Sequence, residues 1–156
     1  GAEYETAQRR PAGSGEGIAC ARLRGAAIAL MAKARPTATG IAVDRLIVAA
    51  DIGRVLNPTL ARQQIEGGLI WGLAAAVGAT TRYRRGLAQA RRLADLNLPH
   101  LAQIPEIAIE LLPSRDDPAG VGEIAGPLVA PAIANALFTI TGRRVRRLPL
   151  SERPLP

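Results

Sequence analysis

The stretch that decides the fold is residues 48–77, VAADIGRVLNPTLARQQIEGGLIWGLAAAV. It predicts a helix that begins at Asn57-Pro58, because asparagine is a good N-cap and proline is favoured at the first helical position. Apolar residues follow at helical spacing, and Gly78 supplies a stop. Gly67-Gly68 lies inside this helix, where each glycine costs about 1 kcal/mol relative to alanine. Close approach of another backbone or of a ligand is the compensation we expect.

The segment before this helix predicts a mostly antiparallel sheet over residues 17–51. Two short apolar runs, 17–23 and 26–35, are separated by Arg24-Gly25, which suits a hairpin. The alanine-rich part of the second run is also compatible with a helix. Residues 41–50 carry the β-branched enrichment of a buried strand. Asp51-Ile52-Gly53 is expected to be the turn that ends it.

The segment after the helix is less regular. Two short strands are expected around Arg85-Gly86, followed by a loop. Residues 106–112 alternate acidic and apolar, as a half-buried strand does. A last helix is expected over about 128–141, apolar almost all round and therefore buried. This range places Pro131 in the first turn and Gly142 at the C-terminal cap.

Together these elements predict an α+β fold, with an antiparallel sheet packed against two main helices. The sheet would draw on residues 17–51, 79–90 and 106–112, and the helices would be 58–77 and 128–141. The first 16 residues are polar and glycine-rich, so a disordered tail or cloning remnant is expected there. Residues 17–156 would form one domain.

Composition narrows the function. The net charge of +7 lies largely in arginine blocks at 82–92 and 143–147, without an aromatic stacking platform, so a nucleic-acid role rests on charge alone and solvated arginines are preferred. One cysteine and one histidine cannot ligate an iron–sulfur cluster or a structural zinc, and no metal ligand is assigned. No apolar run approaches a membrane span. Cytoplasmic and periplasmic locations both stay open.

Gly120-Val121-Gly122-Glu123 carries the chemistry. Its carboxylate stands between glycines just upstream of the last predicted helix. Glycines let backbone approach a ligand, and a partly desolvated glutamate there can serve as a general base. A glycine-rich turn with a solvated glutamate is the alternative, and the local sequence by itself favours that alternative.

Two longer motifs carry a family resemblance. Residues 48–77 contain D-x-G-x-x-x-N-P followed by QIEGG, and residues 120–150 read GVGEIAGPLVAPAIANALFTITGRRVRRLPL. Both resemble the molybdenum-cofactor large subunit of the xanthine oxidase and aldehyde oxidoreductase family, closest to isoquinoline 1-oxidoreductase beta-subunit-like proteins. The resemblance covers roughly residues 15–150 and implies one lobe of a C-terminal molybdopterin-binding domain. Family large subunits are several times longer, which implies a fragment of a longer subunit that is inactive in isolation.

The resemblance also implies a function and a set of site residues. The enzyme would hydroxylate aldehydes or N-heteroaromatic compounds with water as oxygen source. Glu123 would be the general base, Gln64 would hydrogen-bond the molybdopterin, and Gly122 would contact the cofactor. The implied partners are the remainder of the large subunit, a subunit carrying iron–sulfur clusters, and a small-molecule substrate. The rival hypothesis is a structural or interaction module of the same fold that never meets a cofactor.

Three other residues invite a functional interpretation. Glu66 shares a helix with Gln64 but points elsewhere, and we interpret Glu66 and Trp71 as structural. His100 lies in a proline-bracketed loop, where an exposed histidine without a catalytic role is expected. The surrounding segment, Arg92–His100, departs from the family pattern, because the expected aromatic and basic residues are displaced or missing. In relatives this segment lies near the substrate.

Overall fold

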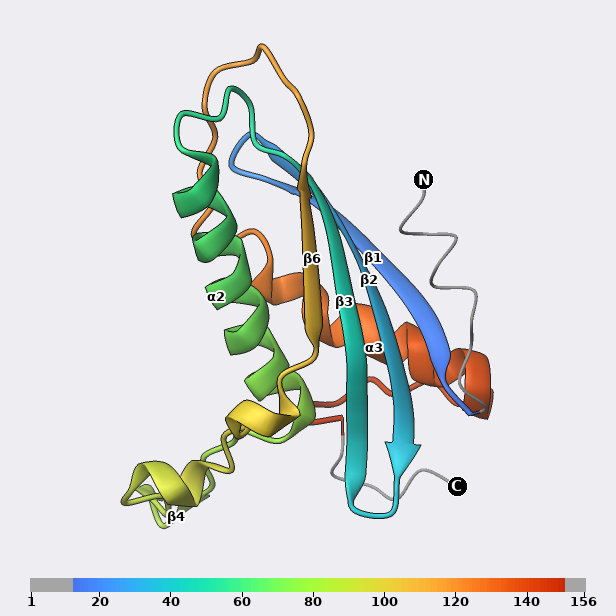
Figure 1. The fold of residues 1–156 in the computed structure, drawn as a ribbon. Helices are drawn as coiled ribbons and strands as arrows, with labels where there is room; N and C mark the ends of the chain where they lie inside the picture. The colour runs from blue at the N-terminus through green and yellow to red at the C-terminus, as the bar shows by residue number, and fades with distance from the viewer. Residues whose placement is uncertain (1–12, 151–156) are drawn as a thin grey trace.

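In the computed structural model, which describes residues 13–150, four strands form one sheet and two helices cover one of its faces (Figure 1). The α+β prediction is confirmed. Strand order is β1-β2-β3-β6. The strands are β1 (Gly15–Leu23), β2 (Ala26–Thr37), β3 (Gly40–Asp51) and β6 (Glu106–Leu111), and the helices are α2 (Pro58–Val77) and α3 (Gly126–Thr141).

The predicted hairpin is confirmed, and its second arm is strand rather than helix. Arg24 and Gly25 both have positive φ, 52° and 86°, as a tight two-residue turn between antiparallel strands requires. Strand β3 then pairs antiparallel with β2. The expected tail was too long, because Gly15 and Glu16 already belong to β1. Residues 1–12 of that tail lie outside the described residues.

Strand β6 departs from the all-antiparallel expectation. It pairs parallel with β3, with Arg45 opposite Glu106, and an ion pair of 3.1 Å joins these two side chains. The reason is topological: β3, α2 and β6 form a crossover that returns the chain to run in the direction in which it left. The alternation of 106–112 correctly indicated a strand but contained no information about its direction.

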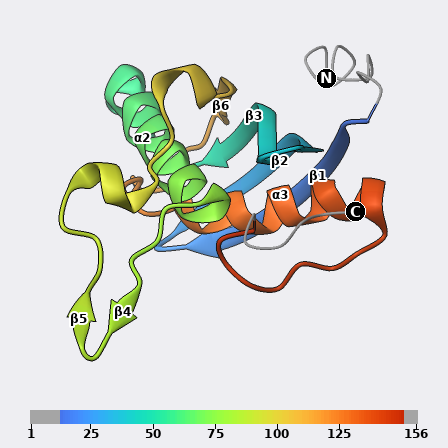
Figure 2. The same ribbon diagram turned by 90° about the horizontal axis from the view of Figure 1, so that it is seen from below.

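The expected contribution of 79–90 to the main sheet is wrong. Strands β4 (Tyr83–Arg84) and β5 (Leu87–Ala88) do pair around Arg85-Gly86, but they form a separate two-stranded hairpin. Figure 2 shows this hairpin projecting away from the four-stranded sheet. All residues of both strands are exposed, Tyr83 and Leu87 included, so neither strand packs against the main sheet.

Both ends of α2 follow the sequence prediction. The side chain of Asn57 accepts a hydrogen bond from the Leu60 N–H at 3.0 Å, and the Gly78 N–H donates to Ala74 at 3.2 Å. One face of the helix is buried, mainly against α3 and to a lesser extent against β6. Its members are Ala61, Ile65, Leu69, Gly72, Leu73, Ala74 and Ala76. The opposite face is left free to form a site.

Helix α3 begins two residues earlier than predicted, at Gly126, so Pro131 lies in its second turn rather than its first. Pro131 is exposed there. Gly142 ends the helix in the left-handed conformation, as expected. The helix lies directly on β1, because a Cβ on Gly17 would collide with the α3 backbone at Ala132 and Ala136. Among the described residues, no helix is both long and apolar enough to cross a membrane.

Candidate functional site

An open cavity of about 620 Å³ lies between the free face of α2 and the segment that leads into α3. Far apart in sequence, Gln64 and Glu123 both line it, and so does Gly122. The two side chains to which the family resemblance gives roles in the site therefore share one concavity. The full lining is Gln63, Gln64, Gly67, Gly68, Trp71, Gly72, Ala75, Gly122, Glu123, Gly126 and Pro127.

The contact between α2 and the start of α3 forms the floor of this cavity. A Cβ on Gly72 would stand 2.5 Å from the Gly126 carbonyl oxygen and 2.9 Å from its Cα, so only glycine fits. Gly68, one turn earlier, would place a Cβ 3.5 Å from Ala125, an ordinary contact. Sequence reasoning missed Gly72. Its spacing of four residues from Gly68, which puts both on one helix face, was the available signal.

Gly67 has a different surrounding. A Cβ built there would meet nothing within 4 Å, and the same holds for Gly122 across the cavity. Gly67 therefore weakens the helix by about 1 kcal/mol without permitting any contact among the described residues. Backbone approach, one of the two compensations expected for the glycine pair, requires glycine at Gly72 rather than at Gly68, where a Cβ would make an ordinary contact. At Gly67 the space is open among the described residues.

Glu123 stands in the irregular segment just before α3. It is the one ionisable side chain among the described residues that line the cavity. Its Oε2 lies 3.1 Å from Nη2 of Arg24, which the tight turn between β1 and β2 brings to this side of the domain. The two side chains are 69% and 67% exposed, so the pair contributes little to stability. We expected Glu123 to be partly desolvated, but the described residues leave its side chain largely exposed.

Gln64 and Trp71 lie on the exposed part of α2. Gln64 is exposed at the cavity, with an amide that can both donate and accept hydrogen bonds. Trp71, which we interpreted as structural, is 79% exposed and lines the same cavity, so the described residues leave most of its side chain uncovered. Glu66 is also exposed, but it is not part of the cavity lining.

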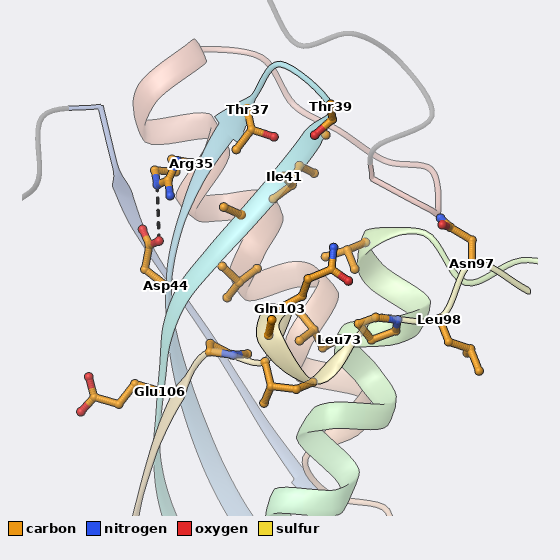
Figure 3. Close-up of a pocket in the computed structure, with 18 residues that line it drawn as sticks. Arg35, Thr37, Thr39, Ile41, Asp44, Leu73, Asn97, Leu98, Gln103 and Glu106 are labelled. Carbon is orange, nitrogen blue, oxygen red and sulfur yellow. Dashed lines mark ion pairs between the residues drawn. The ribbon is translucent and has the colours of Figure 1, made fainter. Parts of the chain in front are cut away.

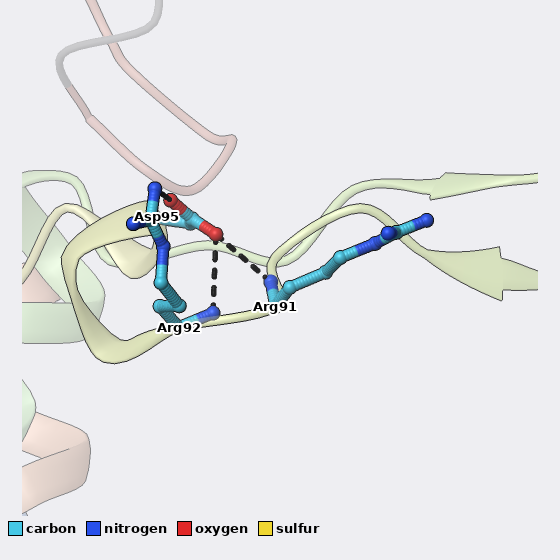
Figure 4. Close-up of polar contacts among 3 residues, drawn as sticks. All are labelled: Arg91, Arg92 and Asp95. Carbon is cyan, nitrogen blue, oxygen red and sulfur yellow. Dashed lines mark hydrogen bonds and ion pairs between the residues drawn. The ribbon is translucent and has the colours of Figure 1, made fainter.

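Nearby side chains cap backbone N–H groups in and beside the segment Arg92–His100. The Asp95 carboxylate accepts hydrogen bonds from the backbone N–H groups of Arg91 and Arg92, at 2.9 and 3.1 Å (Figure 4). His100 is exposed as expected, and its backbone N–H donates to Gln103 at 2.7 Å. None of this segment lines the cavity that holds Gln64 and Glu123.

A second cavity, of about 600 Å³, lies at the far end of the β2–β3 hairpin (Figure 3). It is bounded by that hairpin, the C-terminal part of α2 and the loop from Asn97 to Glu106. An ion pair of 3.4 Å joins Arg35 and Asp44 at its edge. None of the predicted site residues faces it. The first cavity is therefore the candidate site.

The cavity thus holds exposed amides, an aromatic side chain, glycines with open space beside them and one carboxylate. The class of protein follows from the chain's relatives. The chain matches the molybdopterin cofactor-binding domain family over residues 4–105 and belongs to that family, whose cofactor is molybdenum-molybdopterin. The chain thus comes from the molybdenum-binding subunits of the xanthine oxidase group.

Individual relatives are similar to most of this chain, and each is much longer. The chain is 34% identical over 110 residues to isoquinoline 1-oxidoreductase subunit beta of Brevundimonas diminuta, covering 70% of the chain and 14% of that protein. It is 36% identical over 113 residues to a membrane-bound aldehyde dehydrogenase of Gluconacetobacter polyoxogenes, covering 72% of the chain and 15% of that protein. The name of the latter specifies pyrroloquinoline quinone rather than molybdenum.

A solved structure shares the fold. The aldehyde oxidoreductase of Desulfovibrio desulfuricans superposes with a TM-score of 0.68 at 28% identity, covering 83% of this chain and 15% of that one. The chain therefore spans about one seventh of the length of its relatives.

Proposed function

We propose that this chain supplies the general-base wall of the cofactor site in a molybdenum hydroxylase that acts on aldehydes or N-heteroaromatic compounds. The observation that carries the proposal is that one cavity collects Gln64, Gly122 and Glu123 in a chain of the molybdopterin-binding family. Oxidoreductases with these two kinds of substrate stand among the relatives. The whole enzyme's activity is inferred from them.

The residues fit one side of the cofactor. Gln64 can donate to and accept from the edge of a pterin, which carries both kinds of group. Gly67 and Gly122 leave room for that ring, since a side chain at either position would project into open space. When bound, the cofactor supplies a molybdenum that acidifies water and accepts electrons. The remaining contacts would come from the rest of the large subunit.

Glu123 would accept a proton. Hydroxylation replaces a C–H bond by C–OH, takes its oxygen from water, and releases two electrons and two protons. A carboxylate at the cavity mouth can take the proton from the attacking water-derived oxygen, provided that it leaves Arg24. Both side chains are largely exposed, so this separation costs little. The released electrons would pass to iron–sulfur clusters held outside this chain, for which a partner subunit is proposed, since the single cysteine here cannot ligate such a cluster.

The test is Glu123→Gln in the assembled enzyme, with this chain in its natural large subunit. Glutamine keeps the size and reach of the side chain but accepts no proton at neutral pH. We expect kcat to fall by about 10²–10⁴-fold or more, with KM and molybdenum content near wild type. Glu66→Gln is the matched control, because Glu66 lies on α2 outside the cavity lining, and it should retain turnover. Similar behaviour of the two variants would overturn the proposal.

One observation favours a second candidate, a structural or interaction module of the same fold. Glu123 is exposed and pairs with Arg24, as a solvated loop glutamate would. Under this alternative the assembled protein would contain no molybdenum, and Glu123→Gln would change neither its assembly nor any turnover. Metal analysis of the assembled protein separates the two candidates before any kinetic measurement.

A further inference from the structure

Trp71 is the aromatic side chain of the candidate site, and the function proposed above gives it no role. Trp71 is 79% exposed, although burying a tryptophan is among the largest apolar gains that a chain can make. We propose that Trp71 is a stacking wall that positions a planar N-heteroaromatic ring in the cavity. This inference rests on the proposed function and adds the chemical class of the ligand that the α2 side of the site accepts.

The spacing on α2 places Trp71 and Gln64 on the same ligand. The cavity-lining residues of this helix recur at intervals of three and four, so they form one continuous face. Trp71 is two turns beyond Gln64, which puts their backbones about 10 Å apart along the helix axis. A ring that lies against the indole can therefore present its edge toward the Gln64 amide.

The glycines between these two side chains determine the shape of the space. Gly67 and Gly68 lie between Gln64 and Trp71, and Gly122 faces them from the other side. Nothing within 4 Å would meet a side chain at Gly67 or Gly122. An indole ring beside these glycines leaves a flat space, which suits a planar ligand better than a branched one.

The side-chain amides of the lining further restrict the kinds of ligand that the cavity can bind. Gln63 and Gln64 offer donors and acceptors, and no described lining residue carries a positive charge. Together with the Glu123 carboxylate, this lining favours a planar heterocycle that has ring nitrogen atoms and carries no negative charge on its ring. Two sources could supply it, the pterin of the cofactor or an N-heteroaromatic substrate. A pterin has donors and acceptors along its edge, whereas a ring such as isoquinoline offers a single acceptor.

Because Trp71 is the only tryptophan in the chain, its fluorescence reports on this site alone. The experiment titrates the full chain with pterin and, separately, with isoquinoline, corrects for absorbance, and measures protection from quenching by acrylamide. The expected result is saturable quenching with protection by at least one ring. Preference for pterin identifies the cofactor as the source, and preference for isoquinoline identifies the substrate. Unsaturable, collisional quenching by both would overturn the proposal.

Substitutions of Trp71 complete the test. Because they remove the fluorophore, ring binding to these variants is measured by calorimetry. Trp71→Ala should weaken binding of the preferred ring by roughly 5- to 100-fold, the range for lost aromatic stacking. Trp71→Phe should restore much of it. Leu60→Ala is the control, because Leu60 is 58% exposed on the same helix but outside the cavity lining. Equal affinity in Trp71→Ala and wild type would refute the stacking role.

The two proposals fail in distinguishable ways. Ring binding at Trp71 together with full turnover of the Glu123→Gln enzyme would sink the proposed function and leave the stacking wall standing. If Glu123→Gln loses turnover but no ring binds saturably at Trp71, the proposed function stands and the stacking wall is refuted. In that second case the indole would be covered by protein in the assembled enzyme rather than by a ligand.

Discussion

Two glycines on α2 allow the packing of the site to be tested by the same substitution at both positions. In Gly72→Ala the new Cβ would lie 2.5 Å from the Gly126 carbonyl oxygen, 2.8 Å from a methyl group of Val129 and 2.9 Å from the Gly126 Cα. Carbon atoms in contact prefer about 3.5–4.0 Å, so the start of α3 must move by roughly 0.6 Å or more. In Gly67→Ala the new Cβ meets nothing within 4 Å.

Both substitutions gain the same helix propensity, about 1 kcal/mol. Their difference in free energy of unfolding therefore isolates the cost of overpacking, which is about 1–3 kcal/mol in well-packed interiors. Gly67→Ala should be more stable than wild type, and Gly72→Ala should be less stable than Gly67→Ala by that amount. Urea unfolding followed by circular dichroism measures both. Equal stabilisation by the two substitutions would show that α2 and α3 do not meet at Gly72.

Three further outcomes are expected. Gly53→Ala should lose about 2 kcal/mol or more in urea unfolding, because Gly53 has a φ of +69° and its Cβ would collide with the Asp117 carbonyl oxygen. Asn57→Ala should lose about 1 kcal/mol in the same assay, since it removes the side-chain cap of α2, whereas Asn57→Asp should retain most of the stability. The isolated chain should bind no molybdenum, because Gln64 and Glu123 form only one wall of the site; stoichiometric molybdenum in metal analysis of the purified chain would contradict this.

Local chemistry made much of the fold predictable. The cap at Asn57, the stop at Gly78 and the hairpin turn at Arg24-Gly25 each depend on a few neighbouring residues, and all three were correct. The direction of β6 was not predictable in this way, because an alternating strand has the same pattern whether it pairs parallel or antiparallel. Whether β4 and β5 join the main sheet is decided by tertiary packing, and the local sequence does not contain that information either.

The site was predictable to a similar extent. Family motifs identified Gln64, Gly122 and Glu123, and the structure places them at one cavity, while their roles stay predictions. The exposure of Trp71 was not predicted, because it depends on where α3 packs against α2, and a local pattern does not determine that. The pairing of Glu123 with Arg24 joins a turn and a loop far apart in sequence, and no local pattern predicts it.

The most direct test of the central claim is a single-turnover measurement. The assembled enzyme, wild type or Glu123→Gln, is mixed anaerobically with excess substrate, and the reduction of its redox centres is followed in time. If Glu123 is the general base, Glu123→Gln with full molybdenum content should be reduced at least 10²-fold more slowly than wild type, at unchanged substrate affinity. Reduction at the wild-type rate would contradict the assignment of Glu123 as the base.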